Sequence, residues 1–250
     1  MSQLAILLTA CVNPNGMAYT TVQNPQIRLN QYKTTLRWYL ENTKEKIVFI
    51  ENTLCDFSND FYEYITSGRL EYITFEGNTY NRMLGKGYGE AMILNTALEQ
   101  SKILRESDTI IKITGRLKIL NINKLIHNIK SQKTVYANTD IKNGHAFCYS
   151  TIFISPKEFL KKYFLPKINS LNDSNGYYFE HLLYDTMMIW RKAGESHSDF
   201  KSPLIIDGIS GSTGKKYLIS KRGLRLKSLI KYLAHKHGIY RNHFYPDSIY

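Results

Sequence analysis

Cysteines are few in this sequence and long apolar runs are missing, which narrows the possible classes of protein. Cys11, Cys55 and Cys148 are odd in number, lie far apart and form no CxxC pair. Reduced thiols in a cytoplasmic protein are therefore the simplest interpretation. No stretch reaches about 18 apolar residues, so we expect no membrane span. The run from Leu4 to Val12 is short and has no basic leader, which favours a first strand over a signal peptide.

Acidic residues are also scarce, and the excess of positive charge is unevenly placed. The chain has 33 Lys and Arg against 21 Asp and Glu, a net charge of +12. Residues 215–250 alone hold nine Lys or Arg and one acid, Asp247. A basic tail on a nearly balanced body indicates an anionic partner: a phosphate-rich substrate, a nucleic acid or a membrane surface. The 250 residues, 43% hydrophobic, suffice for one large domain, or for one domain with an appendage. We expect a single α/β domain over 1–214 and a basic helical tail over 215–250.

Apolar periodicity predicts alternating strands and helices through the first half of the chain. We expect strands at 4–10, 46–50, 70–75 and 109–113, and helices at 25–40, 58–67 and 90–105. Such alternation indicates a mostly parallel sheet flanked by helices. The second half is less regular. There we expect helices at 123–130, from Pro156 with Ser155 as N-cap, at 178–190 and at 224–234, and strands at 134–137, 146–154 and 203–207.

The central stretch, GKGYGEAMILNTALEQSKILRESDTIIKITGRLK (85–118), begins with three alternating glycines. Gly85, Gly87 and Gly89 allow a close approach to a ligand, and Lys86 among them can pair with a phosphate. The spacing matches neither a P-loop nor the dinucleotide-binding fingerprint. A flexible loop at the start of a helix explains these glycines equally well.

The strand within this stretch ends in polar residues that are good ligand candidates. In open α/β sheets, ligands bind beyond the carboxyl ends of the strands, where we expect Thr114, Gly115 and Arg116. An arginine there can hold a diphosphate through paired hydrogen bonds. Lys112, inside the apolar strand, is costly to bury alone. It therefore either faces the phosphate or belongs to an internal ion pair.

Polar residues also follow the first two strands. Thr9, Ala10 and Cys11 end the first strand, and Glu51 and Asn52 end the second. These groups can read a base and a ribose at the same sheet edge. We expect Arg28, near the start of the first helix, to face that cleft. Ordinary solvated loops are an equally good explanation for each of them.

Glu180 and His181 begin the predicted helix at 178–190. A carboxylate near the positive end of a helix stays ionised and can serve as a general base, with His181 sharing that work. Asp185 is a weaker candidate. The alternative is a helix-start acid that only interacts with the dipole. His235 and His237 have no carboxylate or cysteine nearby to complete a metal site.

The order of these pieces resembles glycosyltransferases with the A-type nucleotide-sugar fold, over about the first 120 residues. The helix GEAMILNTALEQS with Asn95, followed by the strand DTIIKI, stands where that family places a helix and the strand before its Asp-x-Asp metal motif. The segments NPNGMAYT, FIENT, GKGYGEA, KITGRL and GYYFEHLLYD are similar to small bacterial glycosyltransferases from capsule and lipopolysaccharide gene clusters.

The resemblance implies a nucleoside-diphosphate sugar as donor, most readily a UDP-sugar, and a saccharide or lipid-linked oligosaccharide as acceptor. Residues 1–120 would hold the donor and 121–214 the acceptor. Glu180 lies where inverting members carry their catalytic carboxylate. One departure matters: Thr114-Gly115-Arg116 replaces the metal motif. We therefore expect no cofactor and no divalent metal, with Arg116, aided by Lys86 or Lys112, neutralising the leaving diphosphate.

Two further interpretations concern partners. The apolar stripe and flanking cations of 224–234 suit docking on the anionic inner leaflet of a membrane, but packing of that stripe on the domain explains the pattern as well. A nucleic-acid-binding or RNA-modifying protein is the main rival class. The tail's charge permits it, yet no recognised RNA or DNA module is visible.

Overall fold

The computed structural model describes residues 3–142 and 144–217. Within them, the chain forms an α/β structure around a seven-stranded sheet in the order β10-β6-β9-β4-β1-β2-β3. The strands of this sheet are β1 (Leu4–Ala10), β2 (Lys46–Glu51), β3 (Leu70–Thr74), β4 (Thr109–Thr114), β6 (Thr134–Tyr136), β9 (Ile152–Pro156) and β10 (Ser196–Ser198). Only β9 runs against its sheet neighbours. The predicted α/β class and mostly parallel sheet are confirmed. The predicted helix at 224–234 lies outside the described residues.

The inner strands explain why the first half was predictable. β1 pairs in parallel with both β2 and β4. Its residues Ala5 to Leu8 are fully buried, as expected for a parallel strand covered on both faces. The predicted helix at 25–40 is α1 (Pro25–Asn42), which begins after Asn24, whose side chain accepts hydrogen bonds from two backbone N–H groups. The predicted helix at 58–67 consists of a 3-10 turn, η1 (Ser58–Phe61), followed by α2 (Tyr62–Thr66).

Several predicted boundaries are wrong. The helix at 90–105 is two helices, α3 (Gly85–Gln100) and α4 (Lys102–Glu106), because the Ser101 hydroxyl caps α4 by accepting from Leu104 N. The predicted strand at 146–154 is divided. β8 (His145–Cys148) pairs with β7 (Thr139–Lys142) in a hairpin, and only β9 joins the main sheet.

The ends of the second half need correction too. Ser155 is a buried residue of β9 and makes no N-cap hydrogen bond for the helix that follows. The strand at 203–207 is reduced to β11 (Ile206–Asp207), which pairs with β5 (Lys118–Ile119) outside the main sheet. The helix at 123–130 is α5 (Ile122–His127), and the helix at 178–190 is α7 (Phe179–Lys192).

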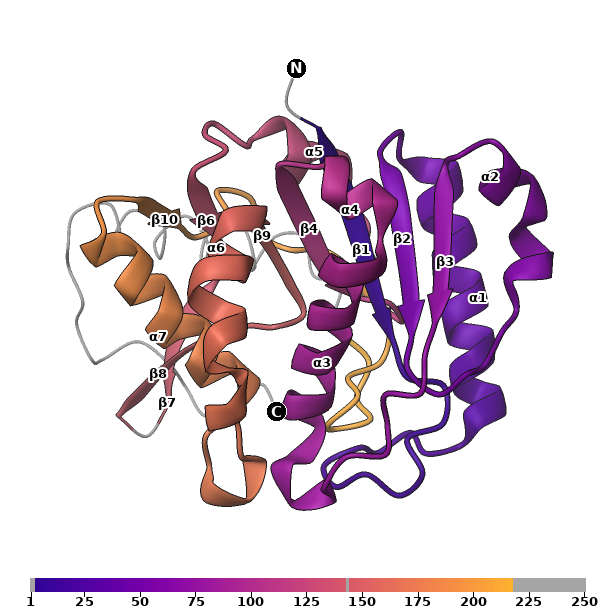
Figure 1. Ribbon diagram of the computed structural model, residues 1–250, viewed down its shortest axis with the longest axis horizontal. Coiled ribbons are helices and arrows are strands. Elements are labelled where there is room, and N and C mark those ends of the chain that lie inside the picture. The colour runs from indigo at the N-terminus through magenta and orange to yellow at the C-terminus, as the bar shows by residue number, and fades with distance from the viewer. Residues whose placement is uncertain (1–2, 143, 218–250) are drawn as a thin grey trace.

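Two apolar cores, one on each face of the sheet, hold the layers together. Tyr32, Leu36 and Tyr39 of α1 pack with α5 against one face. The other face is covered by α3, α4 and α7 (Figure 1). The remaining elements on that side are η2 (Arg82–Leu84), α6 (Lys157–Phe159), a π-helical turn η3 (Leu160–Phe164), and the 3-10 helices η4 (Leu165–Ser170) and η5 (Asp173–Asn175). This three-layer arrangement buries both faces of the sheet.

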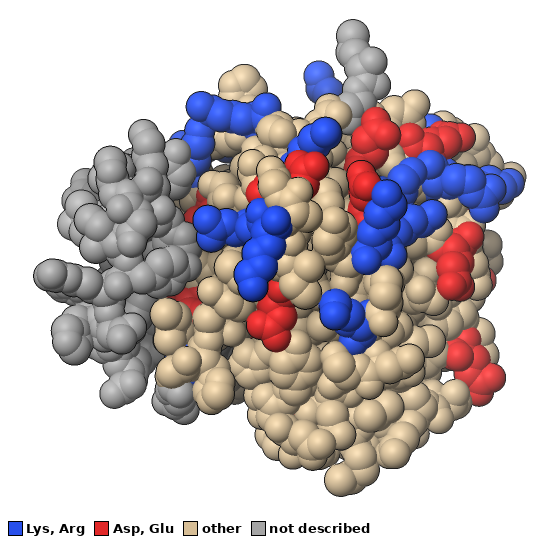
Figure 2. All heavy atoms as spheres, turned by 60° about the vertical axis from the view of Figure 1, so that its left-hand side comes forward, with Lys and Arg blue, Asp and Glu red and all other residues tan. Residues whose placement is uncertain are grey.

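In Figure 1 the arrows of β1, β2 and β3 point toward the lower edge of the sheet, where the orange-yellow segment 206–217 also lies, and β4 runs parallel to β1. The space-filling view shows both signs of charge interspersed over its upper part and a largely uncharged lower part (Figure 2). Among the described residues, no helix combines the length and apolarity needed to cross a membrane.

Candidate functional site at the sheet edge

The end of β4 lies beside the ends of β1 and the start of β9. Thr114 N donates to Thr151 O at 3.0 Å, and Gly115 N donates to Thr9 O at 2.9 Å. A Cβ on Gly115 would lie 2.8 Å from Thr9 O, so this glycine allows the close approach of the two strands. The predicted meeting of residues 9–11 and 114–116 at one edge is therefore what the structure shows.

Arg116 is more than nine-tenths buried at this edge. Its Nη1 makes two long hydrogen bonds of 3.4 Å, to Gln31 Oε1 and to Ile209 O. Its Nε has no hydrogen-bond partner among the described residues. A buried guanidinium with such weak pairing retains unused donors for an anion.

Lys86 of α3 lies against the same loop, residues 208–214, that Arg116 contacts through Ile209. Its ammonium contacts Ser212 Oγ and, at 3.4 Å, Tyr19 O. Ile209 and Ser212 belong to the glycine-containing loop 208–214, which is also bonded to Thr21. Two cations, one from β4's exit and one from α3, thus converge on a single short loop.

Lys112 does not face the sheet edge where a ligand phosphate was expected. Its side chain is fully buried and forms an ion pair with Glu90 of α3. Its Nζ also donates to Ser150 O at 2.6 Å and lies over the rings of Phe153 and Phe179. The internal ion pair, one of the two alternatives, is what the structure contains, and it leaves this ammonium no free face toward a ligand.

Glu180 lies in the first turn of α7 and is partly exposed. Its Oε1 accepts a hydrogen bond of 2.6 Å from Ser150 Oγ. The other carboxylate oxygen makes no hydrogen bond with the described residues. His181 uses its Nδ1 to accept from Tyr178 N at 3.3 Å, and its ring lies 6.2 Å from that of His145. His181 therefore helps to begin the helix beside the carboxylate.

The glycines of the central stretch lie inside α3, which corrects the predicted turn before the helix. Asp173 Oδ2 accepts a hydrogen bond of 3.2 Å from Gly87 N. A Cβ on Gly85 would lie 2.2 Å from the Asp173 carboxylate, and one on Gly89 would lie 2.2 Å from Tyr80 Oη. Close packing against Asp173 and Tyr80 explains these glycines. The Asp173 carboxylate occupies the position beside the glycines where the sequence suggested a ligand phosphate.

Asp173 is not among the residues that the sequence singles out, although its carboxylate packs against the start of α3. Burial raises the pKa of its carboxyl, and the nearby Glu180 adds to that effect, whereas the Gly87 N–H opposes it. Its Oδ1 has no partner among the described residues. Glu90 and Ser150 were missed as well, because nothing in the local sequence links them to Lys112.

Two charged candidates near β1 and β2 are bound by the protein itself. Arg28 does not face an open cleft: Nε donates to Cys11 O at 2.7 Å, and its other nitrogens contact Val22 O and Tyr32 Oη. The buried Glu51 carboxylate accepts from Val12 N, Thr53 N, Thr53 Oγ1 and Cys55 N, at 2.5–2.9 Å. Both residues hold the loops in place, which leaves Glu51 no acceptor for a ribose.

The remaining candidates at the strand ends, Thr9, Ala10, Cys11 and Asn52, differ in whether they have a polar atom free for a ligand. Thr9 and Ala10 are buried, and burial raises the pKa of the Cys11 thiol to about 11. Cys11 is therefore a thiol and a weak nucleophile near neutral pH. Asn52 donates to Gly77 O at 3.3 Å, while its Oδ1 has no partner among the described residues. Asn52 is thus the strand-two residue with an unused polar atom.

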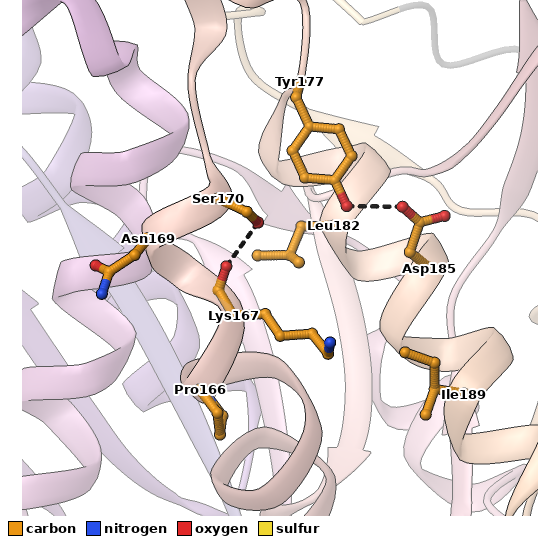
Figure 3. A pocket seen from close by; sticks show the side chains of 8 residues that line it. All are labelled: Pro166, Lys167, Asn169, Ser170, Tyr177, Leu182, Asp185 and Ile189. Atoms are coloured by element: carbon orange, nitrogen blue, oxygen red, sulfur yellow. Dashed lines mark hydrogen bonds between the residues drawn. The ribbon is translucent and has the colours of Figure 1, made fainter.

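A pocket of about 490 Å³ lies elsewhere, between η4 and α7 (Figure 3). Its lining consists of Pro166, Lys167, Asn169, Ser170, Tyr177, Leu182, Asp185 and Ile189. The Tyr177 hydroxyl points at Asp185 and donates to it at 2.7 Å. Neither Glu180 nor any strand-end residue lines this pocket, so we place the candidate site at the sheet edge. The described residues contain no group of three His, Cys, Asp or Glu side chains placed to hold a metal ion.

No protein-family model matches the sequence, and no curated protein matches it significantly. Three solved structures illustrate what the fold is similar to. One is the galactosyltransferase LgtC with donor and acceptor sugar analogues (9% identity over 79% of this chain and 74% of that one, TM-score 0.49). Another is a proposed nucleotide-diphospho-sugar transferase from Desulfovibrio desulfuricans G20 (10% identity over 80% of this chain and 80% of that one, TM-score 0.45). The third is a 4-diphosphocytidyl-2C-methyl-D-erythritol synthase (9% identity over 92% of this chain and 99% of that one, TM-score 0.40). At such identities the activity has to be argued from this chain's own residues.

Proposed function

We propose that the protein is a glycosyltransferase that moves a sugar from a nucleoside-diphosphate sugar, most readily a UDP-sugar, to a saccharide acceptor. Residues 1–120 would hold the donor and 121–214 the acceptor. One observation carries the proposal: Arg116 and Lys86, from separate elements, contact the same loop three residues apart at the mouth of β4. Two cations converging at the carboxyl edge of a parallel sheet suit a pyrophosphate.

The chemistry would need one base and one cationic group. The acceptor hydroxyl oxygen attacks the anomeric carbon, the bond from that carbon to the phosphate oxygen breaks, and the diphosphate leaves with the electron pair. Glu180 takes the hydroxyl proton through its free oxygen, while Ser150 holds the other. Attack from the face opposite the leaving group inverts the anomeric centre. Arg116 offsets the charge that develops on the diphosphate.

Metal independence is part of this proposal, because Thr114-Gly115-Arg116 stands where a carboxylate pair would bind a cation. The physical substitute is the guanidinium with its unpaired Nε. A place in bacterial surface-polysaccharide synthesis, and docking of the basic tail on an anionic membrane, rest on the similarity of the quoted segments and on the charge of residues 215–250.

The test is a thermal-shift screen of nucleoside-diphosphate sugars on the wild type and on Arg116→Gln. A donor that binds only the folded state raises the melting temperature, and we expect the shift to shrink strongly in the variant. The matched control is Lys118→Gln, two residues away in β5, which should retain the shift. Transfer by the donor found there should survive excess chelator. Loss of activity that added Mn²⁺ restores would refute metal independence, and a full shift in Arg116→Gln would refute the pyrophosphate role.

A further inference from the structure

Lys112 is a fully buried lysine in the middle of a sheet, in register with Leu7 on one side and Phe153 on the other. A lone ammonium there would be costly. It is compensated by the carboxylate of Glu90, whose side chain is 24% exposed, and by the Ser150 carbonyl. Thr9 Oγ1 lies 3.5 Å from the same Glu90 oxygen. The group therefore links β1, β4 and α3 with the loop before β9.

A buried ion pair such as this one is weak evidence for a purely stabilising role. A buried ion pair can often be replaced by apolar residues of similar volume with no loss of stability. The surroundings of Lys112 are apolar on this face, with Phe153 and Phe179 rings 5.9 and 5.5 Å from its Nζ. Compared with a methyl group, the ammonium adds the ion pair with Glu90 and a directed hydrogen bond to the Ser150 carbonyl.

Ser150 lies between β8 and β9, outside any strand. Its carbonyl is fixed by Lys112, and its hydroxyl donates to Glu180 Oε1 at 2.6 Å. Lys112 also contacts the ring of Phe179, the residue before Glu180 in the first turn of α7. The buried Lys112 side chain thus contacts both Ser150, which is hydrogen-bonded to the Glu180 carboxylate, and Phe179, which precedes Glu180 in the chain.

We propose that Lys112, held by Glu90, is a positioning residue that orients Glu180 through Ser150. The inference rests on the proposed role of Glu180 as base. The buried cation fixes the Ser150 backbone, the serine hydroxyl then occupies one carboxylate oxygen, and the second oxygen is left facing the acceptor. Neither Lys112 nor Glu90 touches substrate in this arrangement.

A double-mutant cycle tests the coupling. Lys112→Met and Ser150→Ala should each lower kcat about tenfold while leaving the donor KM within twofold, and the double variant should lose no more than either single one. A purely structural role predicts losses that multiply, which would overturn the proposal. Lys46→Met removes an exposed ion pair with Glu106 at the far end of β2 and should leave kcat unchanged. Should Lys112→Met fail to fold, Glu90→Gln replaces it in the cycle, since an amide keeps the side chain's shape without its charge.

A second measurement does not depend on activity. In ¹⁵N-labelled protein, Lys112→Met should shift the amide signals of Ser150 and Glu180, whereas Lys46→Met should not. Unmoved signals would overturn the link even if transfer were observed. Shifted signals in a protein that transfers no sugar would uphold the link and refute the proposed function instead.

Discussion

Asp173 places its carboxylate against the first turn of α3, where Oδ2 accepts a hydrogen bond from Gly87 N at 3.2 Å. The N-terminal end of a helix carries partial positive charge, which favours an anion there. The chain supplies that anion itself. Gly85 and Gly87 are the residues whose missing side chains make room for it.

The first prediction concerns that packing. Gly85→Ala should lower the free energy of unfolding by about 2 kcal/mol or more, because its Cβ would overlap the Asp173 carboxylate. Gly176→Ala is the matched control: φ is +75° there and +80° at Gly85, but nothing lies within 4 Å of its Cβ. It should show only the backbone cost, about 1 kcal/mol. Equal losses in urea denaturation would show that packing at Gly85 is unimportant.

The second prediction concerns pH. Burial raises the pKa of Asp173 above the ordinary value of an aspartate. Between those two values the folded state keeps a proton that the unfolded state has released. The free energy of unfolding therefore falls as pH rises through that window. Asp173→Asn removes the titration, so the stability of the wild type relative to this variant should decline from about pH 4 upward.

An internal control has the opposite sign. Hydrogen bonds from Ser58 lower the pKa of Asp56, so its contribution is present above the unfolded pKa and is lost as pH falls through the folded one. Relative to Asp56→Asn, the wild type should gain stability with rising pH in the acid range. Urea denaturation midpoints of the wild type and the two variants, measured from pH 2.5 to 7, give the pH dependence of both stability differences. A difference that stays flat with pH for Asp173 would contradict a raised pKa of its carboxyl in the folded state.

Much of the first half of the fold could be predicted because its strands are short, β-branched and buried on both faces. β1, β2 and β4 lie within a residue or so of their predicted ends. The second half could not be, since periodicity does not show where a run of apolar residues changes partners. The predicted strand at 146–154 includes parts of both β8 and β9, which pair in different sheets.

The candidate site was predictable only as far as strand ends allow. The sequence places Thr114–Arg116 beside Thr9, because parallel strands end at one edge. The sequence does not show which of these polar groups are already hydrogen-bonded to other parts of the protein. Glu51 and Arg28 look like ligand contacts, but loop backbone atoms take up their hydrogen bonds. The partners of Lys112 come from distant segments, and only the folded chain brings them together.

The third prediction follows from Glu51. Its carboxylate accepts four hydrogen bonds from backbone and hydroxyl donors within the loops after β1 and β2. Glu51→Gln turns one acceptor into a donor facing donors, and should cost about 2 kcal/mol of stability or more. Donor affinity measured by calorimetry well below the melting temperature should stay within about threefold. Glu41→Gln, exposed at the end of α1, controls for loss of charge. A selective loss of affinity at normal stability would mean that Glu51 binds the ribose after all.

The fourth prediction separates the two acids of α7. Glu180→Gln should lower kcat by about two orders of magnitude or more while donor binding persists, because an amide cannot take the acceptor's proton. The Ser150 hydroxyl can still donate to the amide oxygen, so the geometry is preserved. Asp185→Asn changes a carboxylate five residues along the same helix, bonded to Tyr177, and should leave kcat within twofold. Single-turnover rates with the donor from the thermal screen decide between them. A normal rate in Glu180→Gln, or an equal loss in Asp185→Asn, would move the base away from Glu180.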